Sequence, residues 1–243
     1  MNLLSVSADA KTVKGEKKGF LTGILYLSPA DESGITNLCT SASPGCKASC
    51  LYTAGRAVIF PMINEARRRK TQWLVEGRES FIVQLFKDIE ALDRKAHREK
   101  LIPCVRINGT SDLPWLAHRC ASSFPHIQFY DYTKHPRPWV RLRSNYNLTF
   151  SLSELNKKHA LESLARDINV AVVFDTKRGL PLPKFWEGYR VINGDLSDLR
   201  FKDPKGVVVG LHAKGRAKKD CTGFVVRNHP LVQIAGAQCS EGS

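Results

Sequence analysis

Three cysteines lie close together in a short segment rich in Ser, Thr, Gly, Pro and Ala. They are Cys39, Cys46 and Cys50, within NLCTSASPGCKASCLYTAGR at residues 37–56. The chain has seven cysteines in all, an odd number with irregular spacing that argues against a disulfide framework. Thiols clustered in this way favour a metal site, and the alternative is three thiols that hold no metal.

The spacing of these thiols, C-x6-C-x3-C, indicates which metal they fit best. Structural zinc sites pair cysteines at short intervals and have four ligands, and no fourth Cys or His lies nearby in the sequence. Three thiolates suit a [4Fe–4S] cluster with one iron open to another ligand. Gly45, directly before Cys46, would let the backbone approach such a cluster closely. Cys104 is expected in the core, whereas Cys221 could reach the cluster as a fourth ligand.

The elements that must carry this loop alternate between expected strands and helices. A strand is predicted at 19–27, and a helical region with a break at Gly77 is predicted at 61–100. Another helix is predicted at 153–166, with Ser153 as its N-cap. Strands that are separated by long connections are typical of parallel βα units. Further strands are predicted at 101–108, 126–132, 146–152, 168–175, 188–193 and 206–212.

These strands predict an α/β fold: an open or partial parallel (β/α) barrel, TIM-like, with the cysteine loop after the first strand. The late connections are barely long enough for helical crossovers, so an irregular barrel is expected there. No repeat or linker divides the chain, and a single domain over 1–243 is expected. Within it, the cluster loop would span 28–60, the partial barrel 19–212 and a basic C-terminal segment 213–243.

Polar side chains follow most of the predicted strands at the point where each strand ends. In βα barrels the chemistry lies at these carboxyl ends. NGTSD (108–112) follows the second strand and NGDLSD (193–198) follows the sixth. Loops are polar in general, but acidic residues after five consecutive strands favour a common pocket. We expect that pocket to be formed by Asn108, Asp112, Asp175 and Asn193.

The chain is strongly basic, with 37 Lys and Arg against 23 Asp and Glu and a formal net charge of +14. Charge bears on partners rather than on fold, and DNA or RNA is the natural polyanion for such a surface. General solubility is the alternative explanation. Dense basic runs lie at 67–70 and 214–219. From the second run we expect nucleic-acid contacts through Lys214, Arg216, Lys218 and Lys219.

Two absences bear on the cellular setting. No run of eighteen apolar residues occurs, so no membrane span is predicted. Residues 1–20 lack the long apolar segment of a secretory signal. We therefore expect a cytoplasmic protein whose thiols stay reduced, and the sequence leaves its oligomeric state open.

The order of strand, three-cysteine loop, helix and further βα units is similar to that of radical S-adenosylmethionine enzymes. The usual spacing in that family is C-x3-C-x2-C, from which this chain departs. The resemblance implies that the segment after the second strand binds the polar end of S-adenosylmethionine, although the family's Gly-Gly-Glu pattern is missing. The residues concerned are Asn108, Thr110 and Asp112, of which Asp112 could instead cap the following helix.

Three motifs resemble more closely the "gene product 88" domain family of phages and plasmids. They are CTSASPGCKASCLYTAGR (39–56), RINGTSD (106–112) and AKGRAKKDCTGFVV (213–226), which together span most of the chain. This resemblance implies a phage or plasmid protein in the cytoplasm of a bacterial host. It supplies little mechanism.

Two classes of function follow from these features. The first is an enzyme that reduces S-adenosylmethionine to a radical at an iron–sulfur cluster and acts on or near nucleic acid. The second is a non-enzymatic protein, stabilised by its cluster, that binds DNA or RNA in replication or regulation. A pocket beside an open iron would favour the enzyme, and a closed site would favour the binding protein. In the enzyme, the predicted catalytic residues on the substrate side are Asp175, Asn193, Asp195 and His212.

Overall fold

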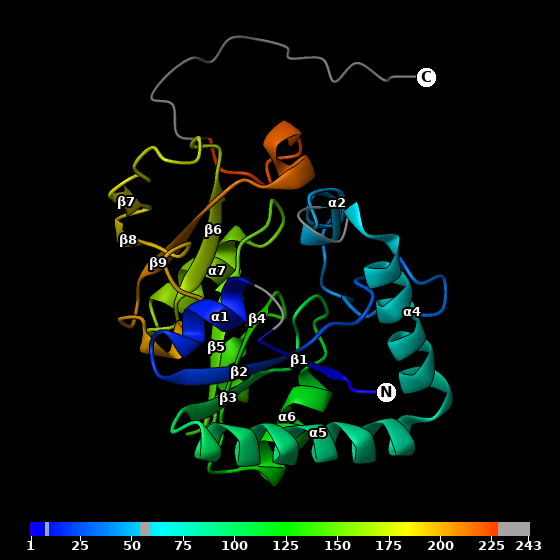
Figure 1. The fold of residues 1–243 in the computed structure, drawn as a ribbon. Helices are drawn as coiled ribbons and strands as arrows, with labels where there is room; N and C mark the ends of the chain where they lie inside the picture. Colours follow the sequence, from blue (N-terminus) through cyan, green and yellow to red (C-terminus); the bar gives the residue numbers. More distant parts are fainter. Residues whose placement is uncertain (8–9, 54–58, 228–243) are drawn as a thin grey trace.

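The computed structural model describes residues 1–7, 10–53 and 59–227 of the chain. Its strands are β1 Leu4–Val6, β2 Phe20–Leu25, β3 Ile102–Arg106, β4 Gln128–Thr133, β5 Tyr146–Ser151, β6 Val170–Phe174, β7 Phe185–Trp186, β8 Tyr189–Asn193 and β9 Val208–His212. They form a nine-stranded sheet with the order β1-β2-β3-β4-β5-β6-β9-β8-β7 (Figure 1). The two outermost pairs are antiparallel and every pair between them is parallel. Because β1 and β7 each have a single neighbour in this order, the sheet is open.

All seven predicted strands are present, as β2 to β6, β8 and β9. The sequence missed β1 and β7, which have three and two residues and lie at the edges of the sheet. The α/β class and the mostly parallel, open arrangement of the strands are confirmed, whereas a partial TIM-like barrel stays a prediction. The late connections were predicted to be barely long enough for helical crossovers, and the described connections after β6 contain no α-helix. The strand order is also irregular there, because β9 lies between β6 and β8.

The helices are α1 Ala10–Glu16, α2 Pro44–Ala48, α4 Pro61–Glu76, α5 Arg78–Arg98, α6 Pro114–Ser123 and α7 Lys157–Leu164. The predicted break is confirmed: Gly77 separates α4 from α5, and its N–H donates to the carbonyl of Trp73 at 2.9 Å. The predicted cap is wrong, because α7 begins after Asn156 rather than at Ser153. The Asn156 side-chain oxygen accepts from the Ser153 N–H at 2.7 Å, which holds a turn before the helix.

Both faces of the central sheet are covered, so β2 is buried along its whole length. On one face α5 packs against β2, and Leu21 joins a large apolar core. On the other face α1 packs against β2, and Phe20 contacts Phe201 of the short 3-10 helix η3 Arg200–Lys202. Cys104 is fully buried on this second face, as predicted for a core cysteine.

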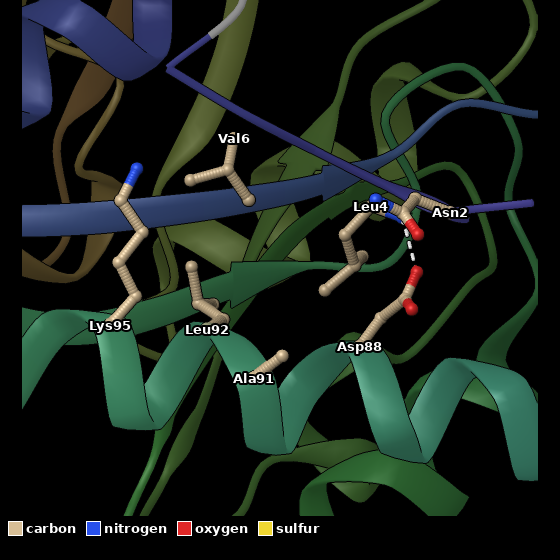
Figure 2. Close-up of a pocket in the computed structure, with 7 residues that line it drawn as sticks. All are labelled: Asn2, Leu4, Val6, Asp88, Ala91, Leu92 and Lys95. Atoms are coloured by element: carbon tan, nitrogen blue, oxygen red, sulfur yellow. Dashed lines mark hydrogen bonds between the residues drawn. The ribbon is translucent and has the colours of Figure 1, made fainter.

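A shallow hollow of about 170 Å³ lies between β1 and α5 (Figure 2). At its rim the carboxylate of Asp88 accepts from the backbone N–H groups of Leu3 and Leu4 at 2.5 and 3.1 Å. None of its lining residues comes from the cysteine loop or from a carboxyl end of a parallel strand, so the hollow is separate from the predicted site. The lining residues are Asn2, Leu4, Val6, Asp88, Ala91, Leu92 and Lys95.

Within the described ranges, every helix is too short or too polar to cross a bilayer.

Candidate functional site

The cysteine loop follows β2 and is bonded first to the segment after β3. The carbonyl of Leu38 accepts a hydrogen bond from the Asp112 N–H at 2.9 Å. The Thr110 hydroxyl donates to the carbonyl of Leu27 at 2.5 Å, and the Cys39 thiol lies 3.8 Å from the Thr110 carbonyl. These contacts place Cys39 beside the carboxyl end of β3.

The middle of the loop is bonded to the segments that follow β4 and β5. Ser41 Oγ lies 3.0 Å from Nδ1 of His135, which follows β4. Glu154, after β5, accepts from the Ser43 hydroxyl and from the Gly45 N–H, both at 2.7 Å. The loop is therefore held across three neighbouring strand ends, with Glu154 anchoring its centre.

The short helix α2 carries Cys46 and begins where the loop is most crowded. The Ser43 hydroxyl caps it by accepting from the Cys46 N–H at 3.2 Å. A Cβ on Gly45 would stand 2.8 Å from both carboxylate oxygens of Glu154 and closer still to Thr222. Glu154 and Thr222 approach so closely that the loop needs a glycine here, and the approach of a cluster to Gly45 stays a prediction.

The late basic motif packs directly against the cysteine loop. Ala217, Phe224 and Val225 form a small apolar cluster, against which Cys46 and Val173 pack. The first and third of the sequence motifs are thus in contact, although they lie at opposite ends of the chain.

The three thiols are half-buried, and none of them forms a disulfide. Burial raises the pKa of the Cys39 thiol to about 12, and negative charge on Asp112 and Cys50 adds to this rise. Burial also raises the pKa of Cys50, with Cys46 acting in the same direction and Lys134 opposing it. The thiols are thus close enough for the charge of one to affect another. Over the described residues, no three His, Cys, Asp or Glu side chains are already arranged as a metal site.

Two of the predicted cofactor residues are already engaged by the protein. Asn108 is buried, and its amide donates to the carboxylate of Asp131 at 3.3 Å. The side-chain oxygen of Asn108 accepts from the Leu113 N–H at 2.8 Å, so it supports the start of α6. The hydroxyl of Thr110 is bonded to the carbonyl of Leu27, as described above.

Asp112 lies beside the cysteine loop, with one carboxylate oxygen already bonded. Oδ2 accepts from the Lys134 N–H at 2.8 Å and from the Thr133 hydroxyl at 3.3 Å. Oδ1 lies 3.9 Å from Nε2 of His135. Burial raises the pKa of Asp112, against the lowering effect of Lys134 and His135. The alternative role as a helix cap is wrong, because α6 has Leu113 as its N-cap and no side-chain cap bond.

The predicted substrate residues lie at or just after the carboxyl ends of β6, β8 and β9. Asp175 and Asn193 are exposed at the ends of β6 and β8. The side-chain oxygen of Asn193 accepts from the Asp195 N–H at 3.0 Å, which closes a local turn. Asn108, in contrast, is buried beside Asp131, and the pocket shared by these residues stays a prediction.

Asp195, His212 and Lys214 form a bonded group where β8 and β9 end. Asp195 Oδ2 lies 2.8 Å from Nδ1 of His212, and Oδ1 lies 2.5 Å from Nζ of Lys214. Burial raises the pKa of Asp195, but hydrogen bonds from Lys214 and His212 outweigh it and lower that pKa to about 2. His212 Nε2 lies 3.1 Å from the Leu180 carbonyl, so both ring nitrogens have an acceptor. All three residues were predicted from the sequence as site residues, but Lys214 was predicted to contact nucleic acid, and it is bonded to Asp195.

The other three predicted nucleic-acid residues, Arg216, Lys218 and Lys219, are exposed on the 3-10 helix η4 Gly215–Lys219. η4 packs against the 3-10 helix η1 Leu51–Thr53, which directly follows Cys50. Figure 1 shows the orange η4 and the loop around α2 at the same end of the molecule. Exposed positive charge and the thiols are therefore neighbours.

The comparison with protein families covers all three sequence motifs. A family model described as Gene product 88 matches residues 2–228. The chain belongs to the Gene product 88 family. A search of curated proteins and a search of solved structures each gave no match. The resemblance carried by the three motifs is therefore confirmed.

In this Gene product 88 protein, four residues near the thiols were not selected from the sequence. Lys134 and His135 follow β4, and Glu154 follows β5, so their positions after apolar strands were the available signal. Lys134 Nζ donates to Ser151 Oγ at 2.6 Å and lowers the pKa of Cys50. The fourth residue, Arg67, belongs to the basic run 67–70, where nothing in the sequence distinguishes it from its neighbours.

Proposed function

We propose that this Gene product 88 protein is an iron–sulfur protein in which Cys39, Cys46 and Cys50 hold a [4Fe–4S] cluster. The observation that carries the proposal is the mutual proximity of these thiols on a loop bonded across the ends of β3, β4 and β5. Three cysteine sulfurs are the donor set that iron–sulfur clusters normally use. Binding would deprotonate Cys39 and Cys50, whose pKa values are raised by burial, and the Lys134 cation favours the thiolate form of Cys50.

We propose further that the protein is radical S-adenosylmethionine-like, with its parallel strands acting as a partial barrel. When bound, the cluster would supply a single electron to the sulfonium of S-adenosylmethionine. Asp112 is the residue suited to receive the amino group of that cofactor. It influences the charge of Cys39, and its Oδ1 accepts no hydrogen bond within the described part of the chain. Asn108 and Thr110 hold the same segment in place: Asn108 accepts from the Leu113 N–H, and Thr110 donates to the Leu27 carbonyl.

Nucleic acid is the proposed partner, because the exposed cations of η4 lie beside the cysteine loop. Arg216, Lys218 and Lys219 would contact phosphates, whereas Lys214 is held by Asp195. A non-enzymatic role in DNA or RNA binding, with the cluster as a stabilising element, is the second candidate. This second candidate is supported by His212, a predicted catalytic residue, because both of its ring nitrogens already have hydrogen-bond partners within the protein.

Iron and sulfide analysis of anaerobically purified protein tests the cluster. We expect about four irons per chain, as this cluster type requires. Cys46→Ala should lose the iron, whereas Cys104→Ala is the matched control, because Cys104 is buried in the core beside Thr22. Colourless protein with stoichiometric zinc would refute the proposal.

The cofactor is tested separately by adding S-adenosylmethionine to the reduced protein. An altered EPR signal and formation of 5′-deoxyadenosine would support the enzyme. An intact cluster with neither response would favour the non-enzymatic binding protein.

A further inference from the structure

Arg67 on α4 is held between two tyrosine rings beside the cysteine loop. Its guanidinium carbon lies 5.3 Å from the ring centre of Tyr26 and 5.9 Å from that of Tyr52. Tyr26 directly follows β2, and Tyr52 lies on η1, two residues after Cys50. Both distances are within the range of a cation–π contact, so the two rings help to place the guanidinium near the end of β2 and the last thiol of the loop.

The hydrogen bonds of Arg67 are incomplete within the part of the chain that the structure describes. A guanidinium carries five N–H donors. Here Nη1 donates to Asn64 Oδ1 at 3.4 Å, and Nε is buried with no partner. No carboxylate among the described residues forms an ion pair with this side chain. A partly buried cation without an acidic partner is unfavourable, and an oxyanion would supply the missing acceptors.

We propose that Arg67 binds a phosphate group of a nucleotide or nucleic acid at the side of the cysteine loop. The inference deepens the proposed function and rests on it for the class of partner. A planar guanidinium matches the oxygens of a phosphate in a way that a lysine cannot. Phosphate is favoured over carboxylate because η4, with its exposed cations, packs against the same η1 that carries Tyr52. A phosphodiester chain that crosses η4 would therefore meet Arg67 next to Cys50.

The competing explanation is purely structural, with Arg67 pinning Tyr52 and hence the loop. Three variants separate the two explanations. Arg67→Gln removes the charge, and Arg67→Lys keeps a charge but loses the planar set of donors. Arg68→Gln is the matched control, since it removes the same charge from the next, exposed position of α4.

The assay is fluorescence anisotropy of a labelled single-stranded DNA oligonucleotide bound to the anaerobically purified full chain, with unlabelled competitors. We expect Arg67→Gln to weaken binding by about tenfold or more, the usual effect of losing a charged hydrogen bond. The affinity of Arg67→Lys for DNA should lie between those of Arg67→Gln and wild type, and the affinity of Arg68→Gln should stay within about twofold of wild type. Inorganic phosphate should displace the DNA from wild type better than acetate does at equal ionic strength.

Equal losses in Arg67→Gln and Arg68→Gln would overturn the proposal, because the effect would then be general electrostatics. Acetate competing as well as phosphate would also overturn it, and so would wild type that binds no DNA. Iron content is measured on every variant. Loss of iron from Arg67→Gln with unchanged DNA affinity would establish the structural clamp alone. Full iron in wild type with no effect of Arg67 would reject this inference while the proposed cluster stands.

Discussion

Asp131 is a carboxyl group buried in the core at β4, and it gives a sharp prediction about stability. It accepts hydrogen bonds from the N–H and the side-chain amide of Asn108 at 2.7 and 3.3 Å, and from the Tyr146 hydroxyl at 3.2 Å. Burial raises the pKa of Asp131 to about 7, and the charge of Arg106 offsets only part of this rise. The ordinary pKa of an aspartate carboxyl is 3.8.

The direction of the effect on stability follows from the protons that Asp131 binds in the folded and in the unfolded chain. Between these two pKa values the folded chain keeps a proton on Asp131 that the unfolded chain has released. The free energy of unfolding therefore falls as pH rises through this window. A difference of about 3 pH units at about 1.4 kcal/mol each gives a loss of about 4 kcal/mol by pH 7 and above. Below the lower value, the loss is absent.

Asp131→Asn cannot ionise, so its stability should lack this fall. Asparagine keeps an acceptor for the Asn108 N–H, and the Tyr146 hydroxyl can turn to accept from the new amide. Relative to wild type, we expect the variant to gain about 3 to 4 kcal/mol between about pH 4.5 and about pH 7.5. Urea unfolding followed by circular dichroism at several pH values measures this difference.

Glu79→Gln is the control, because Glu79 is an exposed carboxylate paired with Arg119 on the surface. Its stability profile should run parallel to that of wild type. Parallel profiles for wild type and Asp131→Asn would refute the reasoning, since Asp131 would then have the same charge in both states.

Two further predictions concern the cysteine loop and the neighbouring basic helix η4. Glu154→Gln removes the charge from the bonds to Ser43 and Gly45, so the free energy of unfolding should fall by about 1 to 3 kcal/mol and the iron content should fall with it. Glu162→Gln on α7 is the control. An unchanged iron content and melting temperature in Glu154→Gln would contradict the anchoring role. Neutralising the exposed cations of η4 should reduce the slope of log affinity for DNA against log salt by about 0.9 per lost phosphate contact, and an unchanged slope would mean that nucleic acid binds elsewhere. The residues to change together are Arg216, Lys218 and Lys219.

The strands could be predicted from the sequence because each is a short apolar run bounded by turn residues. Parallel pairing followed from the long connections between them. The start of α7 could not be predicted, because Ser153 and Asn156 are both residue types that favour an N-cap. In the structure the backbone N–H of Ser153 donates to the side chain of Asn156, and the helix begins after Asn156. The edge strands β1 and β7 are too short to leave a pattern.

The candidate site could be predicted only in part. The sequence shows which residues lie at the ends of strands, but it does not give the order of the strands in the sheet. The cysteine loop could be expected over the strands that follow it, and Asp112 lies there. The bond between Asp195 and His212 depends on β8 pairing with β9, where Asn193 faces Gly210. Arg67 could not be separated from Arg68, because only the positions of Tyr26 and Tyr52 distinguish them.

The packing of the late basic motif against the cysteine loop affects how a substrate of the proposed enzyme would reach the thiols. Ala217, Phe224 and Val225 fill the space between Cys46 and Val173 of β6, so this segment stands between the cysteine loop and the far strands. Cys46 is therefore covered by apolar side chains on the side of β6. Both ring nitrogens of His212 are already bonded, to Asp195 and to the Leu180 carbonyl, so a catalytic role for His212 would require one of these bonds to break. If Arg67 binds a phosphate as proposed, that phosphate would lie beside Tyr52 and Cys50, and neither bond of His212 would have to change.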